Sequence, residues 1–272
     1  MERIDLEKIM KEKVGDKHFG LPPFIHKIFY KYLKKIVKEK EINDLIQSNN
    51  DKKNYDFVTG FFEGLNFIYN VKNKSNQKIP KTGRLFIISN HPLGGLDGLA
   101  LLNAVSEVRQ DVKIIVNDIL MIIENLQEVF IPTATFSDKI SKSNIQKILD
   151  AIYREEAIII FPAGSVSHLT MKGIRDAEWN KSFVSLAKKY SVPIIPTFVK
   201  GRNSFKFYIF GLIKKTLGTL LLPNEIIHKE NKSVDIYFGN TFHVDKSQKK
   251  LSDIEIVKLV KELVYSLPNK IK

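Results

Sequence analysis

Residues 84–98 read RLFIISNHPLGGLDG, an apolar run that leads into a histidine and then, past two glycines, an aspartate. The run from Leu85 to Ser89 has the length and the branched apolar content of a buried strand. A strand that ends in titratable side chains presents them at a cleft, where His91 can accept a proton and Asp97 can hold its ring. The stretch therefore predicts a base for a hydroxyl or a water. The alternative is a loop histidine followed by a helix cap.

A second apolar run, at residues 157–161, ends in a turn of small residues that carries the hydroxyls of Ser165 and Ser167. Further strands are predicted at 113–116, 128–131, 193–198 and 234–238, and helices at 96–108, 119–125, 142–153, 180–190 and 252–266. Continuous apolar strands separated by helices predict an α/β fold with a mostly parallel central sheet covered by helices. The loops that follow parallel strands gather at one edge of such a sheet, which would bring the histidine and the serines together.

Residues 1–80 are predicted to form an N-terminal helical region, with 70–81 as a polar connector, and residues 81–272 a catalytic domain. From Phe24 onward, apolar pairs recur every four residues with lysines beside them. Helical spacing puts Phe24, Ile25, Ile28, Phe29, Tyr32, Leu33, Ile36 and Val37 on one stripe and Lys27, Lys31, Lys34, Lys35 and Lys38 on the other face. This pattern is typical of a helix that lies on a membrane surface. The alternative is an ordinary helix that packs its apolar stripe on the core.

Four segments resemble, in order, the signature blocks of the glycerolipid acyltransferase superfamily. They are the loop at 90–98, VFIP at 129–132, FPAGSVS at 161–167 and SVPIIPTF at 191–198. The resemblance covers roughly residues 84 to 200 and implies transfer of a fatty acyl group from an acyl thioester, carried by acyl carrier protein or coenzyme A, to a lipid hydroxyl. It makes His91 the general base, oriented by Asp97. No other cofactor and no metal site is expected.

The chain also departs from the superfamily pattern. Five residues, rather than the usual four, separate His91 from Asp97, and the glycines between them can absorb the extra one. Ala163 stands where a glutamate is usual, and Val166 stands where the better-known enzymes have an arginine implicated in holding the phosphate of the acceptor. These two differences speak against an acceptor that must carry a phosphate.

Two later segments, GIRDAEWNKSF at 173–183 and GRNSFKFY at 201–208, resemble a bacterial subgroup, often labelled hemolysin-like, that O-acylates lyso-ornithine and related amino-acid lipids. The resemblance implies a lyso-amino-acid lipid of the ornithine or glycine type as the acceptor. Asp176 and Trp179 belong to this pattern, although Trp179 could equally serve packing. The alternative is a 1-acylglycerol-3-phosphate acyltransferase in which Lys172 and Arg175 replace the missing arginine.

The residues expected to contact the substrate lie in the two loops and just beyond them. They are Asn90, Gly94, Gly95, Phe161, Pro162, Gly164, Ser165, Ser167, Lys172 and Arg175. Backbone amides near Gly94 and Gly164, or the hydroxyl of Ser165, could stabilise the developing oxyanion. A different chemistry would make Ser165 the nucleophile of a serine hydrolase, but the Gly-x-Ser-x-Gly turn of such enzymes is absent from the chain.

The net charge of +13 admits anionic lipid, acidic carrier protein or nucleic acid as partners. Residues 200–223 alternate basic with apolar side chains, include no acidic residue, and are too charged for a transmembrane span, so they form a second predicted lipid contact. No nucleic-acid-binding signature occurs, and the absence of cysteine excludes a thiol acyl-enzyme. The first residues lack the apolar core of a secretory signal. We therefore expect a peripheral protein on the cytoplasmic face of the inner membrane.

Overall fold

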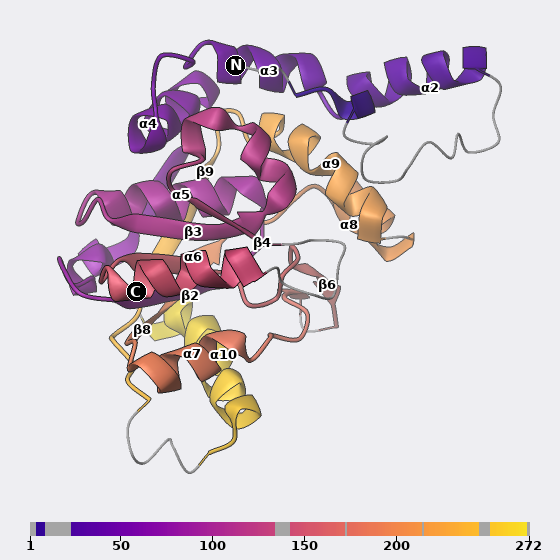
Figure 1. Ribbon diagram of the computed structural model, residues 1–272. Coiled ribbons are helices and arrows are strands. Elements are labelled where there is room, and N and C mark those ends of the chain that lie inside the picture. The colour runs from indigo at the N-terminus through magenta and orange to yellow at the C-terminus, as the bar shows by residue number, and fades with distance from the viewer. Residues whose placement is uncertain are drawn as a thin grey trace.

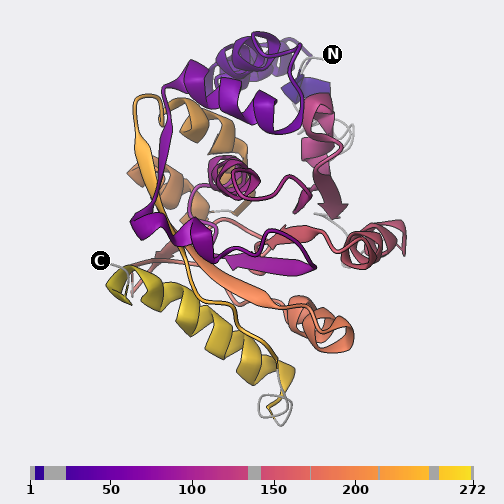
Figure 2. The same cartoon turned by 90° about the vertical axis from the view of Figure 1, so that its left-hand side faces the viewer.

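The computed structural model describes residues 4–8, 23–133, 142–171, 173–213, 215–244 and 251–270. A seven-stranded sheet lies at the centre, with helices on both of its faces (Figures 1 and 2). Its strands are β1 (Ile68–Val71), β2 (Leu85–Ser89), β3 (Val112–Asn117), β4 (Phe130–Thr133), β5 (Ala157–Ile160), β8 (Ile194–Lys200) and β9 (Ser233–Phe238), in the spatial order β1-β9-β8-β2-β5-β3-β4. A separate hairpin consists of β6 (His168–Thr170) and β7 (Gly173–Arg175).

The helices alternate with the strands along most of the chain. They are α2 (Pro23–Ile36), α3 (Glu39–Gln47), α4 (Asn54–Leu65), α5 (Gly95–Ser106), α6 (Lys142–Tyr153), α7 (Ser182–Tyr190), α8 (Phe205–Ile213), α9 (Lys215–Ile227) and α10 (Asp253–Lys270), with short 3₁₀ helices at Lys72–Lys78, Asp118–Ile122 and Glu124–Leu126. The expected α/β class, with a mostly parallel sheet and an N-terminal helical region, is confirmed.

The direction of the strands explains where the predicted site forms. Strands β8, β2, β5, β3 and β4 are parallel, whereas β9 runs antiparallel to β8 and β1 runs parallel to β9. In the middle of the sheet Ile87 of β2 is paired with Ile159 of β5 on one side and Ile195 of β8 on the other. Because β2 and β5 are parallel neighbours, the histidine loop and the serine loop leave the sheet at the same edge.

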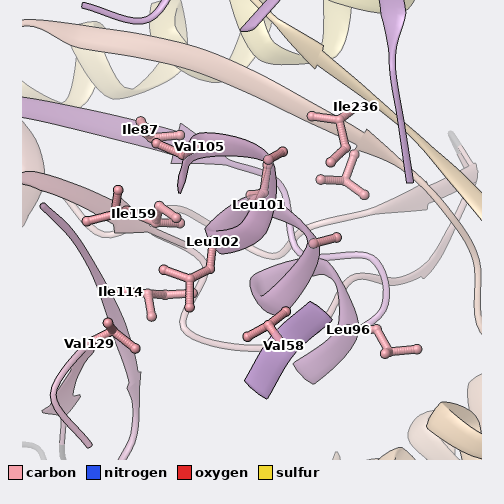
Figure 3. Close-up of a cluster of buried hydrophobic side chains, with 14 of the residues drawn as sticks. Val58, Ile87, Leu96, Leu101, Leu102, Val105, Ile114, Val129, Ile159 and Ile236 are labelled. Carbon is pink, nitrogen blue, oxygen red and sulfur yellow. The ribbon is translucent and has the colours of Figure 1, made fainter. Parts of the chain in front are cut away.

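Each face of the sheet is sealed by its own apolar cluster. On one face, Leu101, Leu102 and Val105 of α5 pack with Ile87 and Ile159 of the sheet, and all five side chains are fully buried (Figure 3). On the other face, helices α6, α7 and α10 cover Phe86, Ile88, Ile158 and Ile160. Full burial of one such side chain stabilises the fold by about 1.5–3 kcal/mol. The five residues of β2 are all buried, so the strand that carries His91 is anchored on both faces.

Two expected elements differ in the structure. The helix expected at 119–125 is replaced by two short 3₁₀ helices, and the side chain of Asn117 caps the first by accepting the Ile119 N–H at 3.0 Å. Strand β4 begins at Phe130 instead of residue 128 and is an edge strand that includes Pro132. An edge position suits proline because its nitrogen cannot donate to a sheet ladder.

The N-terminal segment is helical through α2, α3 and α4, but it also contributes a strand. Ile68–Val71 forms β1, which pairs with β9, so residues 1–80 supply one edge of the sheet. The basic and apolar stretch at 200–223 forms helix α8 and most of α9, and α9 contains Pro223. Among the described residues, no helix combines the length and the apolar character that crossing a bilayer requires.

Candidate active site

His91 and Asp97 meet directly, as the sequence predicts. His91 lies just beyond β2, and Asp97 lies in the first turn of α5. The Nδ1 atom of His91 is 2.9 Å from Oδ1 of Asp97, while Oδ2 of Asp97 accepts the backbone N–H of Leu93 at 2.8 Å. Neither Nδ1 nor Oδ1 has another hydrogen-bond partner among the described residues. Because Asp97 occupies Nδ1, the Nε2 atom is the ring nitrogen left for a substrate.

The surroundings of His91 tune its proton affinity. Burial lowers the pKa of the imidazole. The charge of Asp97, the hydrogen bond with Asp97 and the charge of Asp176 together raise the pKa by more than burial lowers it, so the pKa lies above its ordinary value. The ring of Phe161 stacks on the imidazole, with centroids 4.0 Å apart. The His91 side chain is still 19% exposed, whereas Asp97 is fully buried. The pair thus consists of an imidazole that solvent can reach and a carboxylate that solvent cannot reach.

Gly94 absorbs the extra residue between the histidine and the aspartate. Its φ of +85° is a conformation that side chains rarely adopt, and a Cβ atom there would lie 2.9 Å from Leu222 of α9 and 3.3 Å from Val166. Helix α5 begins at the next residue, Gly95, where the nearest side-chain atom to an added Cβ is 3.7 Å away. The first amides of a helix have no partner within it, so those of α5 are candidates for oxyanion contacts.

In the loop after β5, some polar groups form hydrogen bonds that stabilise the fold and others lie at the site. The N–H of Gly164 donates to the carbonyl of Phe161 at 3.1 Å, which commits this amide to the turn. The carbonyl of Pro162 accepts the Asn180 N–H at 2.9 Å. Ser165 is exposed, whereas Ser167 is buried and its N–H donates to the carbonyl of His91 at 2.8 Å. Phe161 and Ser167 therefore contact His91 directly, while Ser165 faces solvent.

Two asparagines bind the histidine loop to the rest of the sheet edge. The Asn90 side chain donates to the carbonyl of Val199 at 2.9 Å and accepts the Val199 N–H at 2.8 Å, so it joins the loop to β8. Asn203, which sequence reasoning missed, is buried and donates to the carbonyl of Pro92 at 3.3 Å. Its only sequence signal is its place in the segment 201–208.

The residues considered for phosphate binding lie in the β6–β7 hairpin and in the loop before it. The guanidinium of Arg175 lies 4.4 Å from the centre of the Tyr265 ring of α10. Lys172 lies outside the described residues. Val166 is half-buried beside Gly94. No group of three or more histidine and carboxylate side chains in the described part of the chain is placed to hold a metal ion.

Comparisons with known proteins identify the family of the chain. The chain is 31% identical to a lyso-glycine lipid O-acyltransferase of Phocaeicola vulgatus, over 97% of this chain and 95% of the relative. It is 32% identical to a protein of the same name from Bacteroides thetaiotaomicron, over 97% of each. The fold resembles that of the 1-acyl-sn-glycerophosphate (LPA) acyltransferase PlsC from Thermotoga maritima, with a TM-score of 0.50, 16% identity, and coverage of 93% of this chain and 85% of that one. A family model described as acyltransferase matches residues 8–272, so the chain belongs to this acyltransferase family and is an acyl-transferring enzyme.

Proposed function

We propose that this acyltransferase moves a fatty acyl group from an acyl thioester to the free hydroxyl of a lyso-amino-acid lipid, of which a lyso-glycine lipid is the best candidate. The observation that carries the proposal is the His91–Asp97 pair, whose 2.9 Å contact leaves Nε2 of the imidazole for the acceptor hydroxyl. The donor is a thioester of acyl carrier protein or of coenzyme A.

The reaction balances with His91 as the only proton carrier. Nε2 takes the proton of the acceptor hydroxyl while its oxygen attacks the thioester carbonyl, and the imidazolium that forms is stabilised by the buried Asp97. Amides at the start of α5 offer hydrogen bonds to the oxyanion. The tetrahedral intermediate then collapses, the carbon–sulfur bond breaks, and the leaving thiolate takes the proton back from Nε2. The products are an ester and a thiol, and no group on the enzyme is acylated.

Three features favour an amino-acid lipid over lysophosphatidic acid. Both relatives that match almost the whole chain bear the name lyso-glycine lipid O-acyltransferase. The chain has Val166 and Ala163 where a phosphate-binding arginine and a glutamate are usual. Arg175, the described candidate to replace that arginine, stacks on Tyr265 of α10. A site without a bidentate arginine loses its preference for a phosphate-bearing acceptor.

We also propose that the enzyme binds the surface of an anionic membrane, on the cytoplasmic face of the inner membrane. Several exposed large apolar side chains lie on α2, on the β6–β7 hairpin and on α8. They are Ile28 (64%) and Tyr32 (65%) of α2, Met171 (107%) at the tip of the hairpin, and Phe205 (71%) of α8, and others lie on β1, α6 and α10. Elements α2, α8 and β6 all lie toward the right of Figure 1. Exposed Lys31 and Lys35 on α2 and Lys206 on α8 accompany them, and a basic residue near an anionic surface contributes about 1 kcal/mol.

A competition assay tests the acceptor. The purified enzyme receives one acyl thioester and equal amounts of a lyso-glycine lipid, a lyso-ornithine lipid and lysophosphatidic acid, and the products are separated by mass spectrometry. Acyl carrier protein and coenzyme A thioesters are compared in parallel. We expect the diacylated glycine lipid to dominate. Dominant formation of phosphatidic acid would overturn the acceptor assignment and leave the acyltransferase family intact.

A further inference from the structure

Asp176 is a buried carboxylate that the steps above leave without a role. It lies directly after β7 and is 6% exposed. Its Oδ1 accepts the backbone N–H of His91 at 3.2 Å and a short hydrogen bond from the Ser167 hydroxyl, and its Oδ2 accepts the indole N–H of Trp179 at 2.9 Å. Donors from the histidine loop, the serine loop and the segment before α7 thus converge on one side chain.

Hydrogen bonds hold the backbone of His91 on both sides of its Cα atom. Its N–H donates to Asp176, and its carbonyl accepts the N–H of Ser167. Ser167 directly precedes β6 and Asp176 directly follows β7, in which His168 is paired with Arg175. The bond between Ser167 and Asp176 therefore closes the base of the hairpin against His91, at the end opposite the exposed Met171.

The choice of a carboxylate at this position needs a reason beyond packing. Burying a charged carboxylate is costly unless its hydrogen bonds are satisfied and an opposite charge forms nearby. Lys261 of α10 donates to the backbone carbonyls of Asp176 and Ala177, at 3.2 and 2.6 Å, rather than to the carboxylate. The imidazolium that His91 becomes during acyl transfer is a cation that two carboxylates, Asp97 and Asp176, can stabilise.

We propose that Asp176 is a positioning residue for the base, which fixes the His91 peptide and holds the base of the β6–β7 hairpin against it. The inference rests on the proposed role of His91. The charged groups that act on His91 are Asp97 of α5 and Asp176. Arg175, Lys261 and Tyr265 are the titratable groups beside Asp176. Asp97 and Asp176 both raise the pKa of His91.

The test separates the hydrogen bonds of Asp176 from its charge. Trp179→Phe removes the indole N–H that donates to Oδ2 of Asp176. In that background the side chain of Asp176→Asn can keep its oxygen toward His91 and Ser167. Its amide nitrogen then points to the phenylalanine ring, which can accept an N–H contact. Asp176→Ala in the same background deletes both bonds. Trp179→Phe alone keeps both the bonds and the charge, and is the reference for the two double variants.

We expect the asparagine variant to retain kcat within about tenfold of the Trp179→Phe reference. The alanine variant should lose about 100-fold or more in kcat, with little change in the KM for the thioester, because a base displaced by about 1 Å costs that much. Should the alanine variant fail to fold, Ser167→Ala in the wild-type chain deletes one of the same bonds and should lower kcat in the same way. Equal activity of the asparagine and alanine variants, or an unaffected Ser167→Ala enzyme, would overturn the proposal.

A second readout does not depend on turnover. The imidazole signal of His91 in histidine-labelled protein, assigned by its loss in His91→Gln, reports the titration midpoint of the base. Both double variants should titrate at lower pH than Trp179→Phe, because both delete the Asp176 charge. An unchanged midpoint would contradict the inference. If the wild-type enzyme acylates no lysolipid, the proposed function fails, and this midpoint alone then decides for or against Asp176.

Discussion

Replacing Asp97 by asparagine removes a charge from the site and leaves its shape unchanged. One oxygen of Asp97 accepts the Leu93 N–H at 2.8 Å, and that buried donor needs an acceptor. The asparagine should therefore give its oxygen to Leu93 and turn its amide nitrogen toward His91. A donor at that position forces Nδ1 of the imidazole to accept, which places the ring proton on Nε2. The ring nitrogen that should take the proton of the acceptor hydroxyl then already carries one.

The expected loss is large and has a known scale. The same change in the serine-protease triad lowers turnover by about 10⁴ through the wrong tautomer, and we expect kcat/KM of Asp97→Asn to fall by about 10³ to 10⁴. Stability should change little, because the substitution keeps the acceptor for Leu93 and removes a fully buried charge. The thermal midpoint measured on the same samples is the control.

The variant should also change the pH dependence of the residual activity. In the proposed mechanism His91 can accept a proton only when it is neutral, so the rate should rise with pH through its pKa. Asp97 raises that pKa in the wild-type enzyme, and its removal should move the inflection to lower pH. Thiol release from a coenzyme A thioester can be followed with a thiol-reactive dye, because the chain has no cysteine to give background. Turnover within tenfold of wild type, or an inflection that does not move, would refute the pairing as the source of activity.

Two further substitutions test the turn and the membrane surface, each beside a matched control. Gly94→Ala should destabilise the fold by about 1–3 kcal/mol and abolish activity, because φ is +85° and the added Cβ would lie 2.9 Å from Leu222. Gly95→Ala should leave the stability nearly unchanged, because its Cβ would come no closer than 3.7 Å to another side chain, and equal losses of stability would contradict this view of the turn. The double variant Met171→Ser/Phe205→Ser should sediment less with anionic vesicles. The control Ile254→Ser, which alters an exposed apolar residue of α10, should sediment as the wild-type enzyme does. Unchanged binding by the double variant would argue against the proposed surface.

The strands that carry the site were predictable because they are continuously apolar. Leu85–Ser89 and Ala157–Ile160 are buried along their whole length, and such runs stand out in a sequence. Strand β1 did not stand out, because it is short and lies at an edge, and its first residue, Ile68, is 55% exposed. The β6–β7 hairpin was missed for a related reason. Its strands have three residues each and bury little apolar surface.

The sequence likewise predicted some contacts of the site and not others. His91 and Asp97 are close in sequence and joined by one turn, so their contact followed from spacing. Asp176 is joined to Ser167 through a hairpin that the sequence did not predict, and its bond to the His91 peptide depends on the neighbouring positions of β2 and β5. A sequence pattern could single out Asp176 as a residue of interest but could not supply these hydrogen-bond partners.

The most direct test of His91 as the base is the activity of purified His91→Ala with an acyl thioester and a lyso-glycine lipid, with the product measured by mass spectrometry. The side chain lies in a loop at the sheet edge and is partly exposed, so the variant should keep the fold and the thermal midpoint of the wild-type enzyme. We expect the wild-type enzyme to form the diacylated lipid and His91→Ala to form none above the uncatalysed reaction. Near-normal turnover by a folded His91→Ala enzyme would contradict the assignment of the base.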